Sequence, residues 1–197
     1  MSPRTYRMQR RADSAIETRR RIVEATHQLH IDKGVGATTF RDIAARADVG
    51  LGTVYHHFPT YDDVIAACGA YTFDLVQPPA PEVFASLTDP GDRIRMLVGE
   101  LFAFHRRTPW MGRIRGERSQ FAALERSLAQ EEEHRRELVA AALRPLRPSK
   151  RTLALVVAVL DFAVYQSLIA AGLSHAAAVD ETTQLIEHRL LDARSKR

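Results

Sequence analysis

Residues 38–58 carry the pattern that most limits how this chain can fold: two short helical segments joined by a tight turn. In the first segment, Phe40 to Ala47, apolar residues recur at spacings of three and four, which predicts a helix with one buried face. Thr39 stands just before this helix and Asp42 stands three residues later. That arrangement predicts a capping box, which satisfies the free N–H groups at the helix start.

The turn is predicted at Asp48-Val49-Gly50. Such a turn needs one residue with positive φ, and Asp tolerates that conformation better than most residues other than glycine. The second helix is expected to open at about Leu51, with Val54 and Phe58 directed into the core. The residues expected to point outward from it are Thr53, Tyr55, His56 and His57.

This layout suits a protein that reads DNA. A short helix with small residues at its start can enter the major groove, which is about 12 Å wide. Leu51, Gly52 and Thr53 then face base edges, and Gly52 lets the backbone come close. Donors to phosphate oxygens set the register without reading sequence. The residues expected to act in this way are Tyr55, His56 and His57.

The run resembles the DNA-binding domain of the TetR family of bacterial transcriptional regulators, over about residues 18–65. The upstream helix and the Tyr-x-His-Phe ending make this resemblance far more specific than a bare helix-turn-helix. It is carried by Ile22, Ala25, Leu29, Gly34, Thr38, Thr39, Ile43, Ala44, Ala47, Val49, Gly52, Val54, Tyr55, His57 and Phe58. The predicted DNA contacts are Thr39, Arg41, Leu51, Gly52, Thr53, Tyr55, His56, His57 and Tyr61.

Three positions depart from the family pattern. Asp48 stands where the family usually has Gly, and Gly50 stands where Ser is common. Tyr61 stands where a Lys or Arg often contacts a phosphate, so one charge is missing there. Arg41 and the basic residues before position 13 are therefore expected to carry more of the attraction to the DNA backbone.

Composition predicts an all-α protein, because 45% of the 197 residues are hydrophobic while runs typical of strands are nearly absent. Residues 1–60 hold ten Lys and Arg against six Asp and Glu, whereas the remaining residues hold eighteen of each. The formal net charge of +4 thus lies with the candidate DNA reader and favours binding to phosphate. One cysteine, Cys68, and the lack of an N-terminal apolar run predict a cytoplasmic protein.

The predicted order along the chain is a basic arm at residues 1–13, a helix-turn-helix DNA-binding domain at 14–60, a connecting helix at 61–76 and a ligand-binding and dimerisation domain at 77–197. The first helix is expected to begin near Asp13 and to end at Gly34. The arm either touches the minor groove or phosphates or is a tail without a role. Prolines between residues 77 and 81 predict a linker.

In the second domain we expect helices at residues 90–107, 116–143, 153–172 and 174–194. The charged middle of the 116–143 helix is interpreted as a solvated face. The apolar run at 153–172 is long enough to span a membrane, but Asp161 and Gln166 argue against a span. A helix that is apolar nearly all round is instead buried in a core or an interface.

Two apolar C-terminal helices, at about 150–172 and 174–194, predict a homodimer built on a four-helix bundle, which would read a pseudo-palindrome. The resemblance implies the same arrangement, and also a site for a small-molecule effector of unknown identity. Asp161 needs a partner, which could be a cationic ligand, a nearby Arg or His, or the other subunit. Candidate ligand-binding residues, each with ordinary core packing as the alternative, are Phe102, His105, Trp110, Phe121, Asp161 and Tyr165.

These patterns predict a ligand-released transcriptional repressor, with a DNA-binding regulator that has no ligand, or an activator, as alternatives. No Gly-rich phosphate loop, nucleophile elbow, zinc motif or catalytic carboxylate pair is found in the sequence, so neither enzyme activity nor a cofactor is predicted. His27 and His30 have a spacing that can bind metal, but no Cys or carboxylate cluster supports a metal site.

Overall fold

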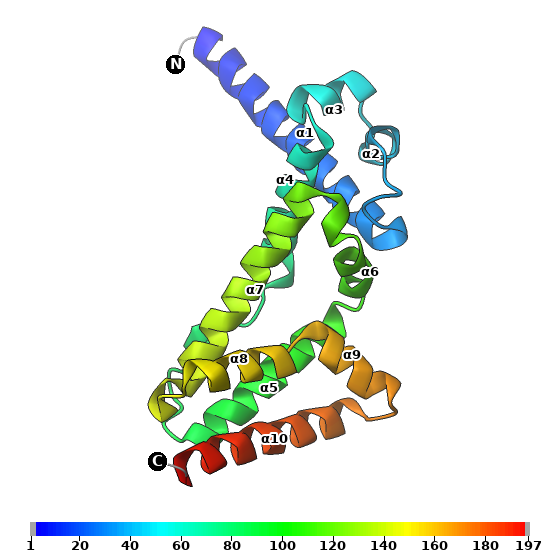
Figure 1. Ribbon diagram of the computed structural model, residues 1–197. Helices are drawn as coiled ribbons and strands as arrows, with labels where there is room; N and C mark the ends of the chain where they lie inside the picture. Colours follow the sequence, from blue (N-terminus) through cyan, green and yellow to red (C-terminus); the bar gives the residue numbers. More distant parts are fainter. Residues whose placement is uncertain (1–2, 196–197) are drawn as a thin grey trace. The chain divides into compact units, whose positions relative to one another are not determined.

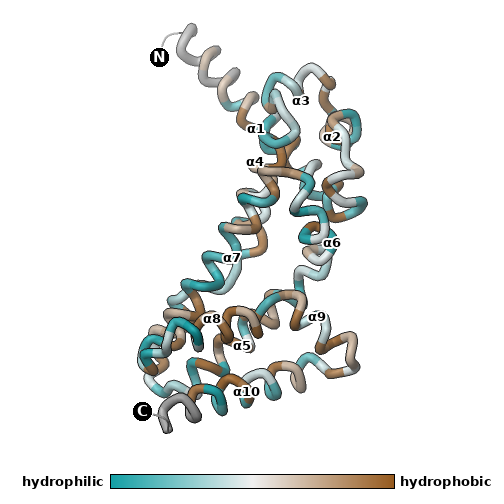
Figure 2. The backbone as a smooth tube through the Cα atoms, in the orientation of Figure 1, coloured by the Kyte–Doolittle hydropathy of each residue, from teal (hydrophilic) through white to brown (hydrophobic). Residues whose placement is uncertain are grey.

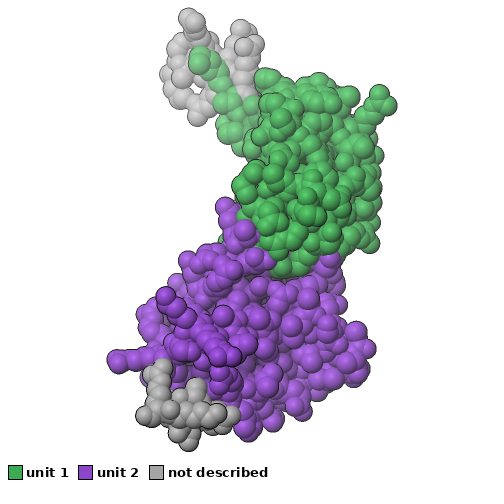
Figure 3. Space-filling model, in the orientation of Figure 1, with its two compact units in different colours: residues 1–76, 113–128 green, residues 77–112, 129–197 purple. Residues whose placement is uncertain are grey.

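The computed structural model describes the backbone of residues 3–195 and the side chains of Met8 and of residues 12–190. Two compact units make up the chain, and they are coloured separately in Figure 3. Unit 1 contains residues 1–76 and 113–128, and unit 2 contains residues 77–112 and 129–197. Every described element is helical, as the composition predicts.

Unit 1 begins with four helices, drawn from blue to cyan in Figure 1. They are α1 (Pro3–Lys33), α2 (Phe40–Ala47), α3 (Leu51–His57) and α4 (Tyr61–Val76). Helix α1 packs against α2 and α4, and α2 packs against α3. Four side chains that are almost wholly buried form the centre of this core: Ile22, Ile43, Val54 and Val64. The predicted bounds of α2 and α4 and the start of α3 are therefore confirmed.

The start of the first helix was predicted wrongly. It begins at Pro3 rather than near Asp13, so residues 3–13 are helical instead of forming an irregular arm. Proline suits the first turn of a helix, because it has no N–H to leave unbonded. The four arginines before position 12 lie outside the residues whose side chains are described, so their contacts with DNA stay a prediction.

A distant segment completes unit 1. Residues 113–128 include the end of α6 (Met111–Gly116), the 3₁₀ turn η2 (Arg118–Gln120) and the start of α7 (Ala122–Leu143). Arg113 Nη1 donates to the carbonyl of Asp32 at 2.9 Å, near the C-terminal end of α1. Glu117 Oε2 accepts the backbone N–H of Gly36 at 2.6 Å. This segment, which we name the clasp, therefore binds the loop between α1 and α2.

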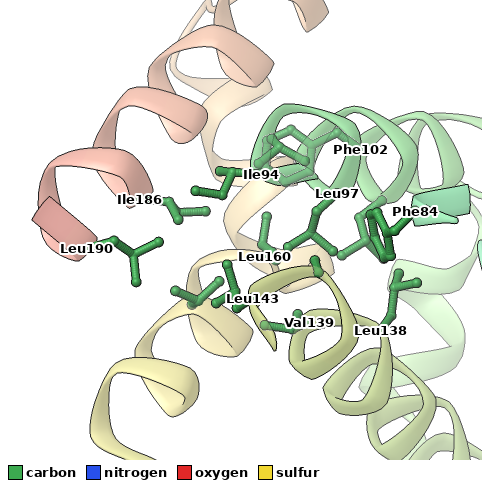
Figure 4. Packing of buried hydrophobic residues seen from close by; sticks show 14 of the residues in the cluster. Phe84, Ile94, Leu97, Phe102, Leu138, Val139, Leu143, Leu160, Ile186 and Leu190 are labelled. Atoms are coloured by element: carbon green, nitrogen blue, oxygen red, sulfur yellow. The ribbon is translucent and has the colours of Figure 1, made fainter. Parts of the chain in front are cut away.

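Unit 2 holds the rest of α7 together with η1 (Pro81–Phe84), α5 (Pro90–Arg107), η3 (Arg144–Leu146), α8 (Lys150–Val159), α9 (Phe162–Ala170) and α10 (His175–Ser195). Helix α10 packs against α5, α8 and α9. Figure 4 shows the core side chains from these helices turned toward one another. Its fully buried members include Leu97, Phe102, Leu143 and Leu160. Asp89 caps α5 by accepting the N–H of Asp92.

Two of the expected long helices are shorter than predicted. The helix expected from residue 116 begins at Ala122, after η2. The helix expected at 153–172 is interrupted, because Asp161 adopts an extended conformation and caps a new helix, α9. Figure 2 shows apolar stretches in both α8 and α9. Among the described residues no single helix is long and apolar enough to cross a membrane; α8 and α9 reach those limits only together, with a 49° bend between them.

The proline-rich segment after α4 is held in place within unit 2. Gln77 has a φ of 46°, which turns the chain sharply after the helix. Its carbonyl accepts from Arg107 Nη2 at 3.1 Å, and the carbonyl of Pro79 lies 2.9 Å from His134 Nε2. The segment therefore has fixed hydrogen-bond partners, whereas the sequence suggested only a linker.

Candidate functional site

Helix α2 has the predicted cap at its start and the predicted positive φ at its end, where the turn to α3 begins. Asp42 donates its N–H to Thr39 Oγ1 at 3.2 Å, and Asp42 Oδ2 accepts the N–H of Thr39 at 2.8 Å. The hydrogen bond from Lys33 is the main reason that the pKa of Asp42 falls to about 2, and the bonds from Thr39 lower it further. Asp48 ends α2 with a φ of 53°, as the turn requires of one residue. The capping box therefore fixes the start of α2, and the left-handed Asp48 ends the helix where the turn to α3 begins.

Helix α3 presents one face to solvent and one to the core. Val54 is fully buried and Phe58 is 1% exposed, which anchors the helix. The side chain of Tyr55 is half exposed, and its ring packs edge-on against Phe40 with a centroid distance of 4.7 Å. A Cβ added to Gly52 would meet no atom within 4 Å. Of the predicted contact residues on α3, the exposed ones are Leu51, Gly52, Tyr55 and His56, and the half-buried ones are Thr53 and His57.

The basic residues near this face differ in whether they already have an ion-pair or hydrogen-bond partner. Arg41 is exposed on α2, and the described residues offer it no ion pair. Arg20, by contrast, pairs with Glu17 and Glu24 on its own helix. Arg21 donates to the carbonyls of Ala47 and Asp48 and thereby secures the end of α2. Arg41 is therefore the arginine on this side that is best placed to meet a phosphate.

Tyr61 lies inside unit 1, although a phosphate contact was predicted for it. Its hydroxyl donates to the carbonyl of Val35 at 2.7 Å and lies 3.2 Å from His30 Nε2. Its ring packs edge-on against Phe40 and Phe121. Burial raises the pKa of its phenol well above the ordinary range. An aromatic ring at the first position of α4 packs inward here, whereas a Lys or Arg there would extend into solvent, so the phosphate contact of Tyr61 stays an untested prediction.

A chain of polar groups is buried between α1 and α4. His27 Nδ1 lies 2.9 Å from Thr72 Oγ1, and His30 Nδ1 lies 3.6 Å from Cys68 Sγ. Burial lowers the pKa of His30 to about 4 and raises the pKa of the Cys68 thiol to about 12. Within the described part of the chain, no group of three His, Cys, Asp or Glu side chains is arranged to hold a metal ion. The contacts of His27 and His30 thus join α1 to α4.

In unit 2, three of the predicted ligand residues meet. The ring centroids of Phe102 and Tyr165 are 4.9 Å apart, and His105 lies 6.0 Å from Tyr165. His105 is 1% exposed, and its Nε2 lies 3.1 Å from the carbonyl of Leu160. Tyr165 also reaches His175, with its hydroxyl 3.2 Å from Nδ1. We name Phe102, His105, Phe162 and Tyr165 the aromatic cluster; it surrounds the break between α8 and α9.

Asp161 lies at that break, and its partner is an arginine. Its Oδ1 accepts the N–H of Ala163 at 2.9 Å, which caps α9, and its Oδ2 lies 2.8 Å from Arg135 Nη2. The sequence left three possible partners for Asp161: a cationic ligand, a nearby Arg or His, or the other subunit. In the structure a nearby arginine, Arg135, is the partner. Arg135 was missed, because the charges around it predicted a solvated face. The side chain is in fact 7% exposed.

The two remaining candidate ligand residues lie elsewhere. Trp110 is half-buried in the turn after α5. Phe121 belongs to unit 1, where its ring packs on Tyr61 with a centroid distance of 5.7 Å. Phe121 is therefore part of the clasp, and the aromatic cluster does not include it.

The helix-turn-helix matches a known protein family. The profile of bacterial regulatory proteins of the TetR family matches residues 22–68, which include α2, α3 and the start of α4. Residues 22–68 thus belong to the TetR family's DNA-binding domain. The repressor KstR of Mycolicibacterium smegmatis is 29% identical over 93 residues, which are 47% of this chain and 46% of that protein. The chain thus matches about half the length of this curated relative.

Solved structures share the fold of this chain over most of its length. A transcriptional regulator from Rhodococcus sp. Rha1 has a TM-score of 0.69 at 19% identity, covering 88% of this chain and 96% of that one. The multidrug binding protein EbrR complexed with proflavin has a TM-score of 0.60 at 24% identity, covering 88% and 99%. The chain therefore shares its helical fold with both of these structures.

Two positions at which the helix-turn-helix departs from the usual TetR-family pattern, Asp48 and Gly50, now have structural explanations. Asp48 takes the left-handed conformation for which the family usually has Gly. Gly50 begins α3 with a φ of −68° and makes no side-chain cap, so the N-terminus of α3 lacks the hydroxyl that Ser would supply. The free N–H groups at the start of α3 are left for another acceptor.

Proposed function

We propose that this chain is a homodimeric transcriptional repressor that binds a pseudo-palindromic operator and leaves it when a small molecule binds. The observation that carries the proposal is the exposed face of α3, at which Gly52 has open space above its backbone while Val54 and Phe58 hold the helix from behind. A helix anchored in this way can lie in the major groove. The uncapped N–H groups at its start suit a phosphate oxygen.

The proposed contacts divide into two kinds. Leu51, Gly52 and Thr53 face base edges and set sequence preference. Arg41 and Tyr55 donate to phosphate oxygens and set affinity and register. Tyr61 is left out of this set, because its hydroxyl is bonded to the carbonyl of Val35.

A dimer is proposed because α8, α9 and α10 leave apolar side chains uncovered. Leu155, Ile169 and Leu185 are 45%, 37% and 57% exposed, one on each helix. A second copy of unit 2 would cover them by two-fold pairing of identical faces. The dimer would also hold two α3 helices on one side of the duplex at a spacing of one turn, about 34–36 Å.

Release by a ligand requires two states of this dimer that bind the ligand with different affinity. The aromatic cluster is the proposed site, since it combines apolar walls with a few converging polar groups. EbrR, which has a similar fold, is described as a multidrug binding protein. The alternative, a regulator without a ligand, is favoured by the tight packing of Phe102 on Tyr165.

The deciding experiment is a band-shift titration of the purified full-length protein on DNA from the promoter next to its own gene. We expect a sequence-specific shift with dimer stoichiometry. A shift that is no stronger than on scrambled DNA at every salt concentration would contradict the proposal. A thermal-shift screen that finds no stabilising compound, with DNA binding intact, would favour the regulator without a ligand.

A further inference from the structure

Arg135 is a buried cation, and two of its guanidinium nitrogens have no hydrogen-bond partner among the described residues. The residue is 6% exposed and lies on α7 within unit 2. Its Nη2 pairs with Asp161 at 2.8 Å, whereas its Nε and Nη1 have no hydrogen-bond partner among the described residues. Burying an N–H of a charged group without an acceptor is unfavourable, and native proteins rarely tolerate it. The two donors of Arg135 therefore indicate an acceptor that the chain itself does not supply.

The surroundings of Arg135 resemble one end of a binding site. Asp161 directly follows Leu160, whose carbonyl lies 3.1 Å from His105 Nε2. The next residue, Phe162, packs edge-on against His105 with a centroid distance of 5.4 Å. Arg135 and the aromatic cluster therefore meet at the same three residues, 160–162. A molecule that reached the guanidinium from the cluster would bring an apolar or aromatic body with it.

The charges at this point favour an anion. Both oxygens of Asp161 are already used, Oδ1 by the N–H of Ala163 and Oδ2 by Arg135. A cationic ligand that displaced Arg135 from Asp161 would leave a buried guanidinium without a counter-charge. An oxyanion instead accepts from an unused N–H group of Arg135, whose partner Asp161 is the N-cap of α9, so the positive end of that helix also favours it.

We propose that Arg135 is the anchor for an effector that carries a carboxylate on an apolar or aromatic body. This inference rests on the proposed ligand-responsive function and names the class of its ligand. A guanidinium has five N–H donors in one plane, and Asp161 engages only one of its nitrogens. A carboxylate can therefore form two parallel hydrogen bonds along the edge that Asp161 leaves free, with the second N–H of Nη2 and with either Nε or Nη1, while the pair with Asp161 stays intact.

The test uses the full-length protein and a panel of acids paired with their neutral amides: benzoate, indole-3-acetate, octanoate and dodecanoate. Binding is measured by isothermal titration calorimetry and by thermal shift at neutral pH. We expect at least one acid to bind about tenfold more tightly than its amide, which is the size of one charge-assisted hydrogen bond. If every acid binds no better than its amide, the proposal is overturned.

Three variants locate the effect. Arg135→Met should abolish the preference for the acid. Arg136→Met is the matched control, because Arg136 is exposed on the next position of α7 and pairs only with Glu133 among the described residues, so it should leave the preference unchanged. Asp161→Asn keeps a residue that caps helices well but removes the competing charge, so it should strengthen acid binding several-fold. Equal loss in both arginine variants, or no gain in Asp161→Asn, would count against the anchor.

Arg135→Lys and Asp161→Asn keep the test decisive if the methionine variant does not fold. The lysine variant retains a charge but loses the planar fork, so acid binding should weaken without vanishing. Operator binding is measured separately without any acid. Intact operator binding with no acid preference overturns only the anchor. Acid binding that depends on Arg135, in a protein that never binds operator, overturns the proposed repressor function and leaves the anchor standing.

Discussion

Glu117 accepts the backbone N–H of Gly36 at 2.6 Å, although 81 positions separate these two residues in the chain. The same carboxylate lies so close to Gly34 that a Cβ there would collide with it. Gly34 has a φ of 93°, in which side chains are strained. The clasp and the α1–α2 loop therefore fit each other closely, and the helix-turn-helix depends on residues far from it in sequence.

Replacing Glu117 by Ala should lower the free energy of unfolding of unit 1 by about 1–2 kcal/mol, because the N–H of Gly36 loses a charged acceptor. Urea unfolding followed by circular dichroism would measure the loss. Glu125→Ala is the control, since Glu125 pairs with Arg118 at the surface and should change stability little. Equal effects of the two variants would contradict a specific role for Glu117.

Gly52→Ala should separate stability from DNA binding. The added methyl group meets nothing within 4 Å, and alanine is favoured in a helix by about 0.5–1 kcal/mol, so the melting temperature should rise slightly. If α3 lies in the major groove, the same methyl group should weaken operator binding, as measured by fluorescence anisotropy. A variant that is more stable and binds operator as tightly as the wild type would show that the backbone of Gly52 does not approach DNA.

Tyr61→Phe should destabilise unit 1 by about 1 kcal/mol and leave DNA binding unchanged. The hydroxyl donates to the carbonyl of Val35, so its loss removes one hydrogen bond from the interior. Thermal unfolding and an anisotropy titration on the same sample would report both quantities. A drop in operator affinity without loss of stability would restore the phosphate contact that the sequence predicted.

Arg41→Ala should weaken binding to all DNA sequences alike and reduce the slope of log affinity against log salt by about 1. Arg41 is exposed on α2 and is proposed to meet a phosphate. Arg20→Ala is the matched control, because Arg20 is already paired with Glu17 and Glu24. Titrations at several salt concentrations would measure both slopes, and identical slopes in the wild type and in Arg41→Ala would rule this phosphate contact out.

Stability should fall as the pH drops from about 6.5 toward 4. The pKa of His30 is lowered to about 4 by burial, whereas an unfolded histidine titrates near 6.5. In that interval the unfolded state binds a proton that the folded state excludes, so the unfolded state gains stability, by at most about 3 kcal/mol. Urea midpoints at a series of pH values should show a shallower dependence in His30→Gln. Parallel curves for the two proteins would mean that His30 does not titrate in this way.

The sequence predicted the helix-turn-helix well because its signals are local. Thr39, Asp42 and Asp48 act within one turn of chain, so their types alone indicate a cap and a positive φ. The orientation of Tyr61 could not be predicted in this way, because it depends on Phe40 and Phe121, and the second of these is far away in sequence.

The effector region was harder to predict for the same physical reason. An aspartate in an apolar run indicated a buried charge at Asp161 but could not indicate which partner neutralises it. Arg135 lies among five other Glu and Arg residues within positions 131–137 of α7, and spacing along the helix did not show that this one faces inward. Its burial depends on α9 starting at Asp161, which is a tertiary relationship.

Cys68 gives the protein a built-in reporter. It is the only cysteine in the chain, and burial between α1 and α4 holds the pKa of its thiol at about 12. A thiol reagent at neutral pH therefore reacts only with molecules in which α4 has separated from α1, and the labelling rate measures how often that occurs. Any compound or DNA that binds the form in which α4 is packed on α1 should slow the labelling by mass action. Candidate operators and effectors can therefore be ranked by how much they slow it, without altering the protein.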